Sequence, residues 1–559
     1  MATNVTLWVN SDPFTFGTLQ VSPHPKLSLH YLKKIDSYVK TKGDSGFPRL
    51  SFPVWKHIAC NKLTMAEDLA WMYFEGFDLL CHYEPEERLQ QAERYRQCKT
   101  KKEQDSLRNQ TSVDTLQFLL YLFIQQVHKI SLRSTLMTGE EWPTRARSPD
   151  ISGKTSSTSK INVQGLDENT CLSFVLNNLN DLMLLLTDTI TYSGTTNDVL
   201  LTIDSVKALG LLISGSYDGC KTVHSLHEVT LQQQVQVKCG YSKISQTFSF
   251  RAFESWLRSN LADNPFGVGN CVASGRRLSW PTTGCDSEGK PESGAKRGRV
   301  ATNAHFTTRD QKLIIISQVC KQTLAKMSTT LTNSRVKVHR CHYAFMYLLS
   351  PMKYVSIEKC RHSTIVLGPV ATTVHVTSCE DITIIAPCRR FSISGSTLCT
   401  AHLMTPTRPL ILGGNDSITL APYHTNYSML EDHMATSGLA TLPNVWNKPL
   451  CVGPDHQEGS PVYSFLSPEE FFMFVIPFEM EGDTKEFPGS LPSKYENALV
   501  TRQKQIKDWQ RTVKEAKLNP AQKQQFQTLV ESRFQAWLLE SGHKRQVDGL
   551  VPVPSSPTK

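Results

Sequence analysis

Histidine and cysteine residues that could bind a metal lie between residues 339 and 362. Their nitrogen and sulfur atoms are the donors that zinc prefers. They are His339, Cys341, His342, Cys360 and His362. Their spacing fits no zinc template, and the fifteen cysteines of the chain include no Cys-X-X-Cys pair. We therefore predict no metal site and interpret these cysteines as small buried residues.

Two further patterns suggest chemistry that the neighbouring residues do not support. Gly284–Lys290 has the spacing of a phosphate-binding P-loop, but Pro291 stands where a Ser or Thr must ligate magnesium. Sugar-cleaving enzymes need paired carboxylates. The strand repeat described next contains only Glu380, Asp381 and Asp416, at different positions of the repeat. The sequence therefore favours neither a nucleotide-binding loop nor a polysaccharide-cleaving enzyme.

Short apolar segments rich in β-branched residues recur every 17 to 19 residues between about residues 360 and 423. Two sets fall in register: Val374–Val376, Phe391–Ile393 and Leu410–Leu412 in the first, and Ile365–Leu367, Ile382–Ile384, Ala401–Leu403 and Ile418–Leu420 in the second. Polar residues, Gly and Pro separate the segments, as expected between strands. A unit this short cannot bury its own apolar face, so successive coils must stack. The pattern predicts a parallel β-solenoid with a continuous interior.

Helical regions are predicted on both sides of this solenoid. Apolar stripes with helical spacing at 116–127, 172–186 and 200–213 predict a bundle or array of helices, which could also serve as a peptide-binding surface. The predicted divisions are a helical region 1–267 with a mobile loop at about 142–165, a disordered linker 268–303, the β-helix 304–435, a C-terminal helical region 436–545 and a disordered tail 546–559.

Two apolar helix faces follow the solenoid. One includes Leu499, Ile506 and Trp509, and the other follows an expected helix start at Asn519 and Pro520. The two helices could form a hairpin that covers an open end of the solenoid or of the helical region. A partner-binding coiled coil is the alternative. The need of solenoids for end caps favours the hairpin.

Composition limits the class of protein. The chain has 60 Lys and Arg against 51 Asp and Glu, a net charge of +9 that is spread along the sequence and does not predict nucleic-acid binding. The odd number of cysteines and the lack of a secretory signal favour a reducing intracellular compartment. The longest apolar runs, such as Leu116–Ile124, are shorter than the ~18 residues of a membrane-spanning helix.

Four segments of the chain are similar to the C-CAP/cofactor C-like domain. They are Tyr354–Glu358, Val374–Thr383, Ala386–Phe391 and Ile418–Tyr423. The resemblance covers about residues 290–435 and extends to tubulin-folding cofactor C, the retinitis pigmentosa GTPase activator and cyclase-associated proteins. It implies a right-handed parallel β-helix within a multidomain α+β chain.

Catalytic members of this family are expected to insert an arginine from a solenoid strand into a GTPase or tubulin nucleotide site. Such an arginine finger accelerates hydrolysis by ~10³ to 10⁵. The resemblance places its position at Ser392, whose neutral hydroxyl cannot replace a guanidinium. Strand alternation predicts that Arg390, Ser392 and Ser394 point outward, whereas Phe391 and Ile393 point inward. Arg389 is expected in the preceding turn.

We therefore predict that the protein is not an enzyme and uses no cofactor, with Arg389, Arg390, Ser392 and Ser394 as a candidate binding face. A register shift of two residues would instead make Arg390 the finger of a GTPase activator. The resemblance implies tubulin, an Arf-like small GTPase or a centrosomal scaffold as partner. It also implies a place in the cytoplasm and cytoskeleton, at centrosomes, spindle poles and basal bodies, with effects on centrosome and Golgi positioning, cell shape and migration.

Overall fold

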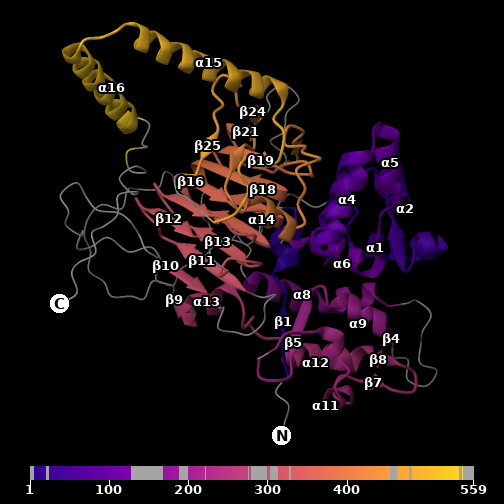
Figure 1. The fold of residues 1–559 in the computed structure, drawn as a ribbon. Coiled ribbons are helices and arrows are strands. Elements are labelled where there is room, and N and C mark those ends of the chain that lie inside the picture. Colours follow the sequence, from indigo (N-terminus) through magenta and orange to yellow (C-terminus); the bar gives the residue numbers. More distant parts are fainter. Residues whose placement is uncertain are drawn as a thin grey trace, which may run out of the picture. The chain divides into compact units, whose positions relative to one another are not determined.

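The computed structural model forms two compact units, which Figure 1 shows with the labels used below. It describes residues 5–19, 24–127, 168–187, 199–220, 222–274, 276–277, 299–302, 312–326, 329–452, 462–476, 481–540 and 544. Unit 1 comprises Met1–His82, Thr100–Ala273 and Phe306–Thr308, and unit 2 comprises Tyr83–Lys99, Ser274–His305 and Arg309–Lys559. The predicted loop at 142–165, residues 278–298 of the predicted linker, including the P-loop-like segment, and the tail 546–559 lie outside the described residues.

Unit 1 is mainly helical, with small antiparallel sheets. Its helices are α1 Leu29–Lys40, α2 Phe52–Lys56, α3 Glu67–Asp78, α5 Lys101–Gln110, α6 Thr115–Ile124, α8 Glu168–Leu185, α9 Ile203–Leu209, α10 Leu226–Thr230, α11 Gln233–Gln236, α12 Phe250–Asn260 and α13 Val268–Ser274, of which the last residue falls in unit 2. In its sheets β5 Ile213–Ser216 pairs with β1 Thr6–Val9 and β6 His224–Ser225, β2 Arg49–Ser51 pairs with β3 Ser112–Asp114, and β8 Thr247–Ser249 pairs with β4 Leu200–Thr202 and β7 Tyr241–Ser242.

Two of the three predicted helices of unit 1 are confirmed. α6 is buried along nearly its whole length, so its apolar residues surround it and make it a central helix of the unit. The predicted helix 200–213 is wrong at both ends, because α9 spans only Ile203–Leu209 between β4 and β5. The Thr202 side chain accepts a hydrogen bond from the backbone N–H of Ser205 and so caps the helix start.

Unit 2 contains the predicted parallel β-helix, built from two ladders of strands. The first ladder runs β11 Leu313–Ser317, β13 Arg335–His339, β15 Tyr354–Glu358, β17 Val370–Thr377, the second part of β18 Glu380–Ser394, β20 Leu410–Ile411 and β23 Leu450–Cys451. The second ladder runs β12 Thr323–Lys326, β14 Phe345–Leu348, β16 Arg361–Leu367, the first part of β18, β19 Thr400–Met404, β21 Ile418–Pro422 and β24 Tyr463–Phe465.

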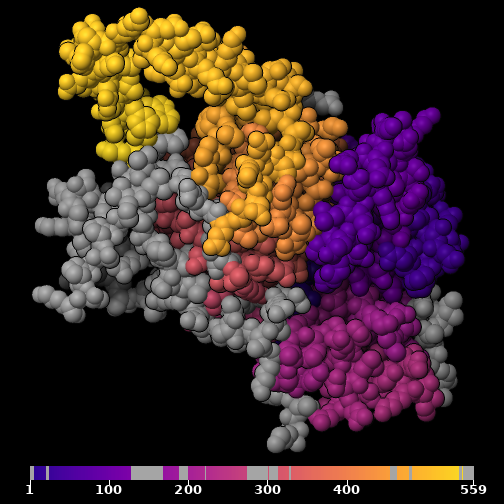
Figure 2. Space-filling model, viewed as in Figure 1, coloured from indigo at the N-terminus to yellow at the C-terminus, as the bar shows by residue number. Residues whose placement is uncertain are grey.

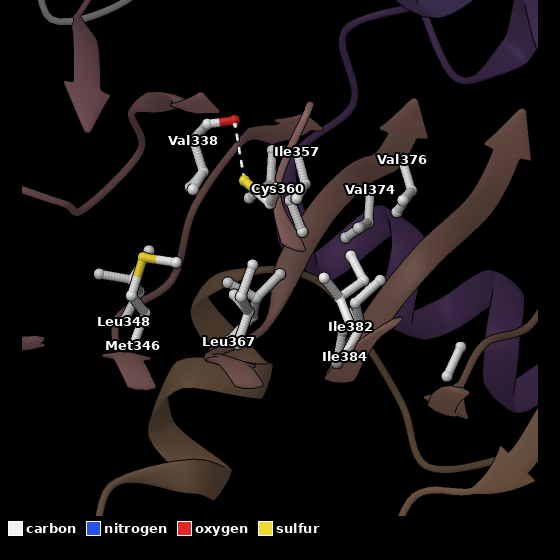
Figure 3. Packing of buried hydrophobic residues seen from close by; sticks show 14 of the residues in the cluster. Val338, Met346, Leu348, Ile357, Cys360, Leu367, Val374, Val376, Ile382 and Ile384 are labelled. Atoms are coloured by element: carbon white, nitrogen blue, oxygen red, sulfur yellow. Dashed lines mark hydrogen bonds between the residues drawn. The ribbon is translucent and has the colours of Figure 1, made fainter. Parts of the chain in front are cut away.

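The interior between the ladders is apolar and continuous from coil to coil. Figure 3 shows side chains of both ladders meeting there, among them Val338, Leu367 and Ile384, which are fully buried. Burying one such aliphatic side chain contributes roughly 1.5–3 kcal/mol. A coil therefore gains its core only when a neighbouring coil covers it.

The predicted register is confirmed in part. Val374 pairs with Phe391 and His375 with Ser392, as predicted. Leu410, expected opposite Phe391, pairs instead with Ser392. The second ladder is displaced by two residues from the prediction, since Ile365 pairs with Ile384 and not with Ile382. Strand side chains alternate with period two, so a two-residue slip leaves the apolar pattern unchanged.

Strands and helices continue the β-helix beyond the predicted range 304–435. β10 Arg299–Thr302 pairs antiparallel with β11 and with β9 Arg276–Arg277 at one end. At the other end β23 and β24 add to the two ladders. Further helices of unit 2 are α14 Leu430–Thr436, α15 Ser493–Glu515, α16 Pro520–Glu540 and also α4 Pro85–Gln97, which packs against α14 although its sequence lies within the N-terminal region.

Cysteines line one interior corner of the coils. Cys341, Cys360 and Cys379 are buried at equivalent positions, and each thiol donates to the carbonyl oxygen two residues earlier, at 3.7, 3.5 and 3.4 Å. Ser396 makes the same contact with Ser394 at 2.9 Å. The turn points backbone carbonyls into an apolar interior, where an unpaired acceptor is costly. A short side chain that carries a donor satisfies them.

Asn415 occupies this corner one coil further on. Its Nδ2 donates to the carbonyl oxygens of Ile393 and Leu412 at 3.0 and 2.7 Å, and its Oδ1 accepts from the Ser396 N–H at 3.0 Å. The Asn415→Ala substitution leaves these buried groups unpaired, and we expect it to lower the free energy of unfolding of unit 2 by about 2–4 kcal/mol.

Urea-induced unfolding of the full chain measures this loss. The control is Asp416→Ala, an exposed neighbour whose removal should change stability by less than about 0.5 kcal/mol. Equal effects of the two substitutions would contradict a structural role for the Asn415 amide.

Candidate functional site

The outer polar face is the set of polar side chains that leave the first ladder on the side away from the interior. It includes Lys337, His339, Ser356, Glu358, His375, Thr377, Arg390, Ser392 and Ser394. The residues between them on the same strands, such as Phe391 and Ile393, are fully buried in the core. The predicted alternation of inward and outward side chains is therefore observed on β18.

Ser392 lies within a hydrogen-bonded network on this face. Its Oγ is 2.7 Å from Nδ1 of His375, which pairs with it across the ladder. The other ring nitrogen of His375 is 2.8 Å from Thr377 Oγ1, and that hydroxyl lies 3.3 Å from Ser394 Oγ. Ser392 and Ser394 are each only 6% exposed. The position that the resemblance assigns to the catalytic arginine thus holds a buried hydroxyl that bonds to its neighbours.

A partly buried ion pair continues the outer polar face on the preceding coils. Lys337 Nζ lies 2.8 Å from Glu358 Oε1, and the Ser356 hydroxyl donates to the same oxygen at 2.7 Å. Burial raises the pKa of Glu358, but the Lys337 ammonium and these hydrogen bonds outweigh burial and keep that pKa below its ordinary value. Burial lowers the pKa of nearby His339 to about 4, so this imidazole is neutral at pH 7.

The two arginines of the candidate binding face lie in different surroundings. Arg389, expected in a turn, lies within the continuous strand β18, so that expectation is wrong. Its Nε donates to the Ala371 carbonyl at 3.2 Å and its Nη2 to the Gly438 carbonyl at 2.6 Å. Arg389 therefore ties β18 to the preceding coil and to the loop after α14. Arg390 pairs with Thr373 across the ladder and is 2% exposed.

The histidines and cysteines considered as metal ligands point to opposite sides of the solenoid wall. Cys341 and Cys360 lie in the interior, whereas His362 is exposed, stacks on Tyr343 at 4.7 Å and bonds to Asp381 at 2.7 Å. Among the described residues, no three His, Cys, Asp or Glu side chains are placed to hold a metal ion. Burial raises the pKa of the Cys379 thiol, which fits a structural role.

Sequence reasoning missed the partners of Ser392 and the ion pair between Lys337 and Glu358. His375 and Thr377 lie seventeen residues before Ser392 and Ser394, and Lys337 and Glu358 lie on two earlier coils. The register of the first ladder is the signal that would have found them. The register between Val374 and Phe391, which was predicted, already places His375 opposite Ser392.

Comparison with known proteins identifies the class of this fold and site. The profile of the family described as "Tubulin binding cofactor C" matches residues 333–450, which span most of the first and second ladders. The protein is therefore a TBCC-domain protein. In the part of the chain that the structure describes, no helix is long and apolar enough to cross a membrane.

The full length of the chain is similar to curated relatives named TBCC domain-containing protein 1. The Bos taurus protein is 49% identical over 98% of this chain and 97% of its own length. The Homo sapiens protein is 48% identical over 98% and 97%, and the Xenopus laevis protein 41% identical over 98% and 99%. This chain belongs to the TBCC domain-containing protein 1 family.

The buried neutral His339 predicts a pH dependence of stability. The unfolded chain takes up a proton on this imidazole near pH 6.5, whereas the folded chain does so only near pH 4. The unfolded state therefore binds more protons in that window, and folding stability falls as the pH falls from 6.5 towards 4. Between pH 7 and pH 5 the loss due to His339 is about 2 kcal/mol.

Urea unfolding of the full chain at pH 7 and pH 5 tests this. The His339→Gln variant should lose about 2 kcal/mol less between the two pH values than the natural protein does. The control is His82→Gln, which replaces an exposed histidine. A pH dependence that is the same with and without His339 would refute the prediction.

Proposed function

We propose that this protein is a non-catalytic adaptor of the tubulin cofactor C family, which binds its partner without stimulating GTP hydrolysis. The observation that carries the proposal is that Ser392, at the position that the resemblance assigns to the catalytic arginine, is a buried hydroxyl that bonds to His375. A finger acts through a charged, forked guanidinium that reaches into a partner's nucleotide site. Neither Ser392 nor the network around it supplies such a group.

Arg390 is the alternative finger, because it leaves the same face of β18 two residues earlier. That offset displaces its origin by about 6.6 Å along the strand. Misplacement by even 1 Å can cost two orders of magnitude in rate. Arg390 is also only 2% exposed, so its guanidinium would have to leave buried surroundings to reach a partner. Both points favour the adaptor over the GTPase activator.

The family supports tubulin as the first partner to test, since the matched profile carries the description "Tubulin binding cofactor C". An Arf-like small GTPase and a centrosomal scaffold are the other candidates that the resemblance implies. With such partners the protein acts in the cytoplasm and cytoskeleton, at centrosomes, spindle poles and basal bodies. Support of centrosome and Golgi positioning, cell shape and migration is part of the same proposal.

A GTPase assay separates the adaptor from the activator. GTP hydrolysis by tubulin with its folding cofactors, and by Arf-like GTPases, is measured with the natural chain and with Arg390→Ala. We expect no stimulation by either, where a working finger gives ~10³ to 10⁵. Co-sedimentation with tubulin is measured in parallel and should show binding by both proteins.

Ser392→Arg is the matched variant, because it restores a guanidinium at the finger position. Any gain of hydrolysis in this variant alone would support the assignment of that position. Stimulation by the natural chain that Arg390→Ala abolishes would overturn the adaptor proposal. Urea unfolding of each variant shows whether it is folded, since both positions are buried.

A further inference from the structure

The first turns of α15 cover one end of the solenoid. Tyr495 packs into the interior cluster, and its hydroxyl donates to the Leu466 carbonyl at 2.7 Å. Arg502 donates to the carbonyl oxygens of Phe471, at 2.6 Å, and Glu469. This part of α15 caps the interior, as predicted for the hairpin, whereas the described residues of α16 add no side chain to the interior cluster. The cap ends near Arg502, although the helix continues to Glu515.

Beyond Arg502 the two C-terminal helices leave large apolar side chains in solvent. We define the C-terminal apolar surface as Ile506 and Trp509 of α15 with Leu529, Val530, Phe534 and Trp537 of α16. Each of these six side chains is between 42% and 56% exposed. Trp509 meets Phe526 at a ring-centroid distance of 6.0 Å, which joins the two helices. Figure 2 shows both helices, in yellow, projecting beyond the strands of unit 2.

Exposed apolar side chains gathered in this way mark a binding surface. The spacing of the apolar residues on α15 indicates that this surface binds another helix. Beyond Arg502, Ile506 and Val513 lie seven residues apart, and Trp509 lies three residues after Ile506. Leu499, seven residues before Ile506, continues the same face but packs against the solenoid interior. These are the a and d positions of a heptad repeat, the pattern by which helices pair with other helices.

The residues that flank this seam carry no charge. They are Gln503, Gln505, Gln510 and Thr512, at the e and g positions that face a partner helix. Arg502 lies at a d position but is bound to the solenoid, and the charged residues of α15 beyond it lie on the side away from the seam. Arg511, for example, pairs with Asp508 at 3.1 Å and with Glu515 at 3.9 Å on its own helix. Two identical helices can therefore meet along the seam without bringing like charges together.

α16 also favours a neutral protein partner. Its Lys523 and Arg533 are balanced by Glu531 and Glu540, so the helix carries no excess of basic charge. A helix that binds anionic membrane surfaces carries Lys and Arg on its polar face. α15 has such an excess, with six Lys and Arg against three Asp and Glu, but α16 supplies four of the six side chains of the C-terminal apolar surface. A charged protein partner would likewise need complementary charges beside the seam, which α15 lacks. A second copy of this chain needs no such charges, because its own seam is flanked by the same uncharged residues.

We propose that the C-terminal apolar surface binds the same surface of a second copy, so that the protein is a homodimer joined by its C-terminal helices. Such an interface is isologous, because each helix pair meets its own equivalent. The dimer carries two solenoids, one from each chain. This inference rests on α15 and α16 and not on the proposed function.

Sedimentation equilibrium and light scattering of the full-length chain test the proposal. At micromolar concentrations the mass should be twice the 62.9 kDa of one chain. Ile506→Glu and Trp537→Glu should each raise the dimer dissociation constant at least about tenfold, as expected for residues central to an interface. Both side chains are exposed in the single chain, so these variants should fold. Ile244→Glu, at a fully exposed isoleucine of unit 1, is the matched control and should leave the constant unchanged.

Charge pairs across the seam give a second test that does not depend on removing apolar residues. A chain with Gln505→Lys and Gln510→Lys should dimerise at least about tenfold more weakly, and so should a chain with Gln505→Glu and Gln510→Glu. Mixing the two chains should restore dimers that contain one of each.

Three results would overturn the proposal. They are a single-chain mass at all concentrations, a dimer that Ile506→Glu and Trp537→Glu leave intact, and mixed charge variants that stay apart. Flotation with vesicles of phosphatidylcholine, or of phosphatidylcholine with phosphatidylserine, by a protein that remains monomeric would assign the surface to a membrane and would also refute the dimer.

Discussion

The vertical hydrogen bonds between coils are the interaction on which unit 2 depends. They place each residue directly over its equivalent on the next coil, so a chemical requirement at one position recurs along the stack. Val355, Val374 and Phe391 follow one another in the interior for this reason. At the interior corner each coil presents a backbone carbonyl that requires a short donor side chain. Cys341, Cys360 and Cys379 supply this donor on successive coils. The cysteines that suggested metal chemistry are thus explained by the backbone of the coil.

The fold could be predicted because a short strand repeat has few ways to bury its apolar residues. The register of the second ladder could not, because Ile382 and Ile384 are equally suited to face the interior. The packing of α4 in unit 2 could not be predicted from the sequence for a different reason. Its helix is largely polar and gives no apolar stripe, yet Gly438, with φ +61, brings the backbone of the loop after α14 so close that a Cβ there would lie 3.0 Å from Pro85. Such a contact depends on backbone shape and not on hydrophobic pattern.

The outward direction of Ser392 followed from strand alternation, whereas its burial did not. Alternation states which side of a strand a residue leaves, but residues far away in the sequence decide whether that side meets solvent. In the structure β18 holds neighbouring segments in place through hydrogen bonds. Arg389 binds the loop at Gly438, and the carbonyl of Arg389 accepts hydrogen bonds from Thr405 and Thr407 at 2.9 and 2.7 Å. A strand that fixes this many neighbours is poorly suited to move an arginine into a partner.

An adaptor catalyses no reaction, so its effect depends on how long it stays bound to its partner. A single solenoid releases its partner whenever one interface opens. Two solenoids in one homodimer would hold a partner that offers repeated sites until both interfaces open together, which raises the apparent affinity without any new contact. The proposed loss of catalysis at Ser392 and the proposed dimer through α15 and α16 are independent of each other. Together the two proposals describe a protein that acts by staying bound to a structure with repeated sites. A microtubule lattice or a centrosomal assembly would provide such sites.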